Sequence, residues 1–146
     1  MSSITTVNQT ENQVQFNIDQ SKMFIWDNRY ENVTFRNLTG GTLSYAVGTV
    51  LGRISATGKV TEMKSAATDG SELPIGILAT VITDLATVSD VVINMCTAGD
   101  VAEEKLIFNG ADVITTAEQA RIYRDWLQLA GIKAVLGTDL TGFDNQ

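Results

Sequence analysis

The 146-residue sequence contains no histidine, one cysteine and one proline, and these absences exclude several kinds of chemistry. Without histidine the chain cannot form a Ser-His-Asp triad, a Cys-His pair or an imidazole zinc site. The single cysteine, Cys96, excludes an intramolecular disulfide and a thiolate cluster, and its apolar neighbours predict a buried, inert thiol. We therefore expect no cofactor, no metal site and no catalytic residue, although chemistry based on lysine or carboxylate side chains stays open.

Basic residues are also few, because 10 Lys and Arg stand against 17 Asp and Glu, which gives a net charge of −7. They are scattered, whereas a surface that binds a phosphate backbone needs clusters of them. No apolar run is long enough to span a bilayer, and the first residues lack the apolar segment of a signal peptide. We therefore expect neither a nucleic-acid partner nor a membrane partner. The absence of disulfides also predicts assembly in a reducing cytoplasm.

The stretch from Ala46 to Val81 has the strongest β pattern in the sequence. Apolar residues predict one strand within Val47 to Ile54 and another within Pro74 to Val81, with a polar strand between them. Gly58 and Gly70 supply the positive φ that tight turns require at the ends of this polar strand. The proline at the start of the last strand loses no ladder hydrogen bond there. This stretch is therefore predicted to be the centre of the fold.

Further strands are predicted on both sides of this stretch. Alternating apolar and polar residues predict strands at Gln13 to Ile18 and at Val33 to Phe35. An apolar run predicts a buried strand at Asp90 to Cys96, followed by a turn at Ala98 to Asp100. A last short strand is predicted at Ile132 to Leu136.

One helix is predicted, from Thr115 to Ala130. Thr115 and Glu118 have the spacing of a capping box, in which each side chain bonds an unpaired N–H of the first turn. An apolar stripe that includes Trp126 follows with helical periodicity. Gly131 stands where a left-handed residue commonly ends a helix.

Five short motifs follow one another in a fixed order between Gly40 and Ile132. They are GTVLGR at Gly48–Arg53, AATDGSE at Ala66–Glu72, PIGILA at Pro74–Ala79, GDVAEEKL at Gly99–Leu106 and LAGI at Leu129–Ile132. In order and spacing this series resembles the bacteriophage head decoration (capsid cement) proteins of the lambda protein D type.

The resemblance implies a mainly β (α+β) fold, which we expect to be a compact β-barrel or β-tulip-like domain with one C-terminal amphipathic helix and an extended N-terminal arm. We expect residues 1–30 to form the capsid-contacting arm, 31–136 the β-rich decoration domain and 137–146 a loose C-terminal tail. The implied function is that of a structural virion protein without enzymatic activity. It would bind the outer surface of the expanded capsid, bridge neighbouring capsomers and stabilise the head against internal DNA pressure.

The resemblance also implies the partners. The arm would contact the major capsid protein, and the chain would form a homotrimer at three-fold and quasi-three-fold positions. The candidate contacts in the arm are Val14, Phe16, Ile18, Phe24 and Trp26. Its alternating strand is either an ordinary first strand of the domain or a donor strand that adds to the sheet edge of another protein.

Two other functions stay open. A head fibre or a receptor- or carbohydrate-binding virion module would need Trp26, Tyr30 and Trp126 to be exposed as a stacking platform. An enzyme that uses carboxylates would need a cleft with two facing acidic side chains, which the scattered Asp and Glu residues do not predict.

Overall fold

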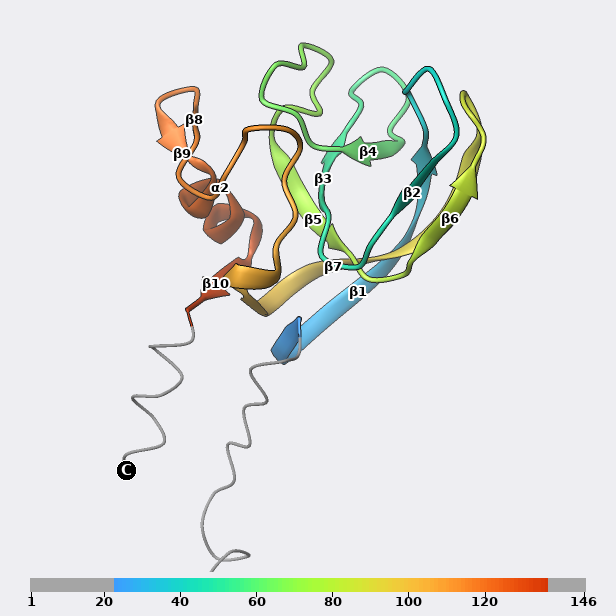
Figure 1. Ribbon diagram of the computed structural model, residues 1–146. Coiled ribbons are helices and arrows are strands. Elements are labelled where there is room, and N and C mark those ends of the chain that lie inside the picture. Colours follow the sequence, from blue (N-terminus) through green and yellow to red (C-terminus); the bar gives the residue numbers. More distant parts are fainter. Residues whose placement is uncertain (1–22, 137–146) are drawn as a thin grey trace, which may run out of the picture.

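A computed structural model describes residues 23–136 and shows a fold whose regular elements are nearly all β-strands (Figure 1). The predicted strand at Gln13 to Ile18 and the expected tail at 137–146 lie outside the described residues. The elements are β1 (Phe24–Arg36), β2 (Leu43–Tyr45), β3 (Val50–Arg53), β4 (Val60–Glu62), β5 (Pro74–Leu78), β6 (Ile82–Leu85), β7 (Asp90–Ala102), the 3₁₀-helix η1 (Glu103–Lys105), β8 (Ala117–Glu118), β9 (Arg121–Ile122), α2 (Tyr123–Ala130) and β10 (Ile132–Val135).

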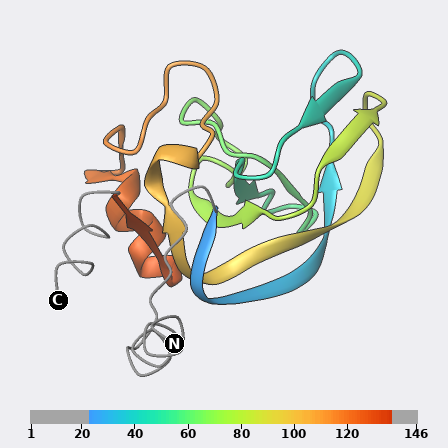
Figure 2. The same ribbon diagram turned by 60° about the horizontal axis from the view of Figure 1, so that its bottom comes forward.

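Five strands form a closed barrel. They follow the order β1-β4-β3-β5-β7, and β1 pairs again with β7, which closes the circle. The strands β1 and β7, of 13 residues each, run antiparallel and form a long curved ribbon (Figure 2). The strand β10 adds to β7, while β2–β6 and β8–β9 form separate two-stranded sheets. The predicted fold class, a mainly β barrel with one C-terminal helix, is confirmed.

Three neighbouring strands of the barrel, β3, β5 and β7, are buried on both faces. Each contributes one residue to a core enclosed by the barrel strands and an adjacent residue to a second core beneath α2. A strand covered on both sides needs a continuous apolar run, and this explains why the sequence pattern is strongest here. The pairs, with the residue of the barrel core first, are Leu51 and Val50, Leu78 and Ile77, and Met95 and Cys96.

The helix α2 covers the second core. Its residues Tyr123 and Leu127 are fully buried, and the Tyr123 ring stacks on Phe108 with the ring centroids 6.1 Å apart. The Tyr123 hydroxyl donates a hydrogen bond of 3.1 Å to the Glu72 carbonyl, and burial raises the pKa of Tyr123 to about 12. Gly131, at φ 101°, ends the helix, as predicted.

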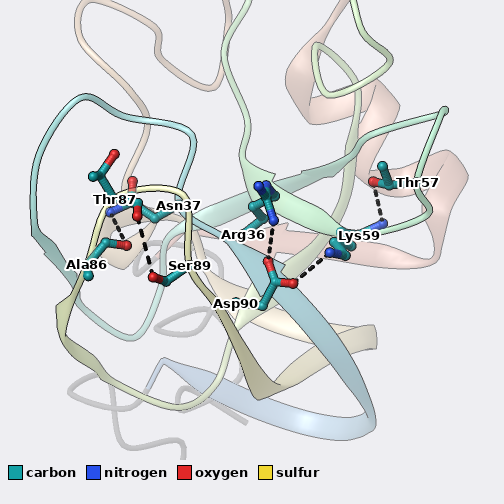
Figure 3. Close-up of polar contacts among 8 residues, drawn as sticks. All are labelled: Arg36, Asn37, Thr57, Lys59, Ala86, Thr87, Ser89 and Asp90. Atoms are coloured by element: carbon teal, nitrogen blue, oxygen red, sulfur yellow. Dashed lines mark hydrogen bonds and ion pairs between the residues drawn. The ribbon is translucent and has the colours of Figure 1, made fainter.

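The seam between β1 and β4 has the fewest paired residues of any junction between neighbouring barrel strands. The two strands share a single parallel register pair, Phe35 with Val60. Beside this pair, the Asp90 carboxylate accepts hydrogen bonds from Lys59 Nζ at 2.6 Å and from the Arg36 guanidinium at 3.1 Å (Figure 3). One carboxylate at the start of β7 therefore links a cation from each side of the seam.

The predicted helix start is wrong, because α2 begins at Tyr123 and not at Thr115. Glu118 lies in β8, which pairs with β9 across a two-residue turn. Gln119 and Ala120 form that turn at φ 52° and 67°. Two successive positive φ values suit a tight hairpin and cannot occur inside a right-handed helix.

Two predicted strand boundaries also differ from the structure. The predicted turn at Ala98 to Asp100 is wrong, because β7 continues through it to Ala102 and pairs there with both β1 and β10. The strand β5 ends at Leu78, which leaves Val81 exposed. In the predicted buried strand, Val92 lies on the outer face of the ribbon and is exposed.

Replacing Asp90→Asn should lower the free energy of unfolding at neutral pH and have little effect in acid. The hydrogen bond from Lys59, followed by that from Arg36, holds the pKa of Asp90 below its ordinary value of 3.8. A carboxylate whose pKa is lowered in the folded state stabilises the fold above its unfolded pKa, and this contribution is lost as the pH falls through the folded pKa. Urea unfolding of both proteins should therefore show a difference that closes below about pH 4.

The same comparison in high salt should show a smaller difference, because these half-exposed charges are screened. A difference between the two proteins that stays constant between neutral pH and acid would contradict this account of the seam.

Candidate functional site

Both ends of the described chain lie at the same end of the barrel. The strand β1 starts at Phe24, opposite Val101, and β10 runs parallel to β7 until Val135 pairs with Ala102. The two ends flank the last residues of β7 on opposite sides, so they lie two strand spacings apart, about 10 Å. We call this end the terminal edge, defined by Phe24, Val101 and Val135 (Figure 1).

Three aromatic residues of β1 lie at or near the terminal edge. Phe24 packs on the second core and meets the Tyr30 ring edge-to-face, with the ring centroids 5.7 Å apart. Trp26 is 62% exposed and Tyr30 is 47% exposed. Partial burial, and to a smaller extent the nearby Cys96, raises the pKa of Tyr30. These rings combine an anchored residue with two that can contact another molecule.

Only two of the five predicted contact residues belong to the described part of the chain. Phe24 points inward as an anchor, whereas Trp26 is largely exposed. Val14, Phe16 and Ile18 lie outside the described residues, so their role stays a prediction.

The ladder between β1 and β7 is irregular around Trp26. Its register shifts between Phe24 and Trp26, between Trp26 and Arg29 and again before Tyr30, and Asp27 has a φ of 48°. Such bulges bend a strand and change the direction of its side chains. The irregular backbone of this segment therefore determines how Trp26 is presented.

Asn28 and Gly99 hold this irregular segment in place. The Asn28 amide donates a hydrogen bond of 3.0 Å to the Asp100 carbonyl. Gly99 has a φ of 115°, and a Cβ added to it would lie 2.7 Å from the Asn28 Cα. Neither residue was predicted to support the arm, although an isolated glycine in an apolar strand pattern is the usual signal for a bulge or close backbone approach.

Among residues 23–136, no group of three or more His, Cys, Asp or Glu side chains could hold a metal ion. Cys96 is fully buried, and burial raises the pKa of its thiol, which keeps it protonated at neutral pH. Within the same range, no helix has both the length and the apolar character needed to cross a bilayer.

The stacking platform expected for a carbohydrate-binding module is not assembled. Trp26 and Tyr30 lie on β1, whereas Trp126 lies on α2 and packs against the second core. The Trp126 indole N–H donates a hydrogen bond of 2.8 Å to the Glu118 carbonyl, and the Arg121 guanidinium lies 5.5 Å from the ring centroid. The Trp126 ring thus has intramolecular partners on its edge and over its face.

A protein-family model described as "Bacteriophage lambda head decoration protein D" matches residues 29–132. No curated protein sequence matches the chain. The matched range begins inside β1 and ends at the first residue of β10, so it includes the other barrel strands and α2. Phe24 and Trp26 precede it.

Replacing Gly99→Ala should destabilise the protein strongly, because the new Cβ meets Asn28 backbone at a position that also has a positive φ. We expect a loss of roughly 3 kcal/mol or more in the free energy of unfolding. Urea unfolding followed by tryptophan fluorescence measures this loss.

Gly58→Ala is the matched control, because Gly58 has a φ of 74° but no atom within 4 Å of an added Cβ. It should cost only the left-handed backbone term, about 1–2 kcal/mol. Equal losses in the two variants would show that the close approach to Asn28 is unimportant.

Proposed function

Because the chain belongs to the family of the bacteriophage lambda head decoration protein D, whose members are structural proteins of the virion, we propose that it acts as a capsid cement. In this role it binds the outer surface of the expanded capsid, bridges neighbouring capsomers and stabilises the head against the pressure of packaged DNA. The observation that carries the proposal is the family match over residues 29–132. The partner is the major capsid protein, and assembly takes place in the host cytoplasm.

We further propose that residues 1–30 are the capsid-contacting arm, 31–136 the decoration domain and 137–146 a tail. The family match begins at residue 29, next to this boundary, which supports a division there. The strand β1 begins at Phe24, so the last residues of this arm, 24–30, already pair with β7 next to the terminal edge. The 22 residues before Met23 could reach at most about 75 Å from the barrel if fully extended.

The proposed contact is strand addition to a sheet edge of the capsid protein. Backbone hydrogen bonds would supply affinity, while the alternating side chains Val14, Phe16 and Ile18 would set the register. Trp26, being exposed beside the entry of the arm, would add an aromatic anchor of the kind that dominates many interfaces.

A homotrimer at three-fold and quasi-three-fold positions would strengthen this attachment. Three arms that act together raise the effective concentration of each arm at its site, so even weak single contacts would release slowly. The net charge of −7 suits an outer surface, because it disfavours binding to the DNA inside. The cement would therefore act mechanically, by raising the free energy needed to separate capsomers.

Trp26→Ala should weaken binding to expanded, undecorated heads of the cognate phage by about tenfold, as expected for loss of an aromatic anchor. Co-sedimentation measures binding, and the temperature at which the heads release DNA measures stabilisation. Leu129→Ala, 63% exposed on α2 against 62% for Trp26, is the matched control and should bind like the wild type.

Deletion of residues 1–22 should abolish stabilisation of the heads while leaving the barrel folded, which circular dichroism would check. Unexpanded heads should bind little protein, because their lattice has a different spacing. Failure of the wild-type protein to bind expanded heads would refute the proposed function.

A further inference from the structure

At the end of the β1–β7 ribbon opposite the terminal edge, two segments without charged residues lie between the charged residues Arg36, Asp84 and Asp90. The connections from β1 to β2 and from β6 to β7 meet there, and we call residues 37–43 and 85–89 the loop tip (Figures 1 and 2). Neither segment contains Asp, Glu, Lys or Arg, although the chain as a whole has 27 such residues, 17 acidic and 10 basic. The loop tip exposes three apolar side chains, Leu38, Leu43 and Val88.

The loop tip is held rigidly around one buried side chain, Asn37. Its amide donates hydrogen bonds of 2.9 Å to the carbonyls of Gly41 and Leu85, and so ties the two connections together. Its backbone N–H donates to the Ser89 carbonyl at 3.0 Å (Figure 3). Its carbonyl accepts from the Val88 N–H at 2.9 Å. A surface fixed in this way loses little conformational entropy when it binds.

Val88, in the turn between β6 and β7, has an unusual backbone conformation for its residue type. Its φ is 56°, in the left-handed region that β-branched residues rarely adopt, and its side chain is 62% exposed. Glycine would adopt this conformation more easily, and an exposed valine contributes little to the core. Strained backbone of this kind clusters at functional sites, which makes the exposed Val88 side chain a candidate for recognition.

The charge distribution favours a second copy of the chain as the partner of the loop tip. Two copies of a chain with a net charge of −7 repel one another, and they meet at least cost through a surface free of charges. Depletion of charged residues also characterises the centre of protein interfaces. We propose that the loop tip, with Val88 at its centre, is the contact between copies of this chain. This inference rests on the proposed function, which brings three copies together around one axis, where identical residues approach each other.

Cross-linking of a single introduced thiol tests the contact directly. The only native cysteine, Cys96, is fully buried, so Val88→Cys gives one reactive surface thiol. A short bismaleimide should link these copies roughly tenfold faster or more than it links Val113→Cys copies, because contact raises the effective thiol concentration. Val113, 52% exposed on the connection before β8, is the matched control. The reaction is run with free protein and with protein bound to expanded heads.

Faster linking at Val88 in either state supports the contact, and equal rates at the two positions in both states overturn it. The variant Val88→Gly removes the side chain and also relieves the backbone strain. Since this change does not strain the fold, a loss of association would come from the missing side chain and not from misfolding. Val88→Gly should remain folded and lose self-association, measured by sedimentation or on heads. The control Val81→Gly changes a valine that is 59% exposed, and it should keep self-association. Self-association of Val88→Gly equal to that of the wild type would also count against the contact.

The proposed function is tested separately by head binding of the unmodified chain. Binding to heads, with no faster cross-linking at Val88 in either state, leaves the cement role intact and refutes the loop-tip contact. Cross-links in solution without binding to heads support the contact and refute the cement role.

Discussion

The strands β3, β5 and β7 separate two apolar cores, and the rest of the molecule is arranged around them. Adjacent residues such as Leu51 and Val50 point to opposite cores, so a register slip of one residue would exchange them. Because of this constraint, α2 packs on one face of these three strands, and the part of the barrel formed by β1 and β4 lies across their other face. The single register pair between β1 and β4 suffices because the central strands already hold both neighbours in place.

The long strand β7 connects this centre with both proposed contact regions. Its last residues lie between the start of β1 and the end of β10, at the terminal edge. Its first residues lie beside the loop tip and carry Asp90, which links Lys59 and Arg36. Attachment to the capsid and contact between copies would therefore use opposite ends of one ribbon, and neither would block the other.

Much of the fold could be predicted from local sequence patterns, because these patterns reflect the backbone preferences of individual residues. The strand that begins at Pro74 and the helix end at Gly131 follow from the backbone preferences of proline and glycine. The β8–β9 hairpin could not be predicted, because its left-handed residues are Gln119 and Ala120 rather than glycine or asparagine. Of the candidate site, the sequence identified Phe24 and Trp26. The supporting contact between Asn28 and Gly99 joins residues 71 positions apart, so even where Gly99 signals a close backbone approach, the sequence does not show that Asn28 is its partner.

The pairing of β1 with β7 determines how the barrel bears tension applied through its first residues. Hydrogen bonds of an antiparallel ladder lie perpendicular to the strands, so a pull along β1 loads many of them at once, in shear. The ladder has ten register pairs, from Phe24 with Val101 to Arg36 with Asp90, whereas β10 has only four. A pull on the amino-terminal side thus meets a stronger mechanical clamp than one on the carboxyl-terminal side.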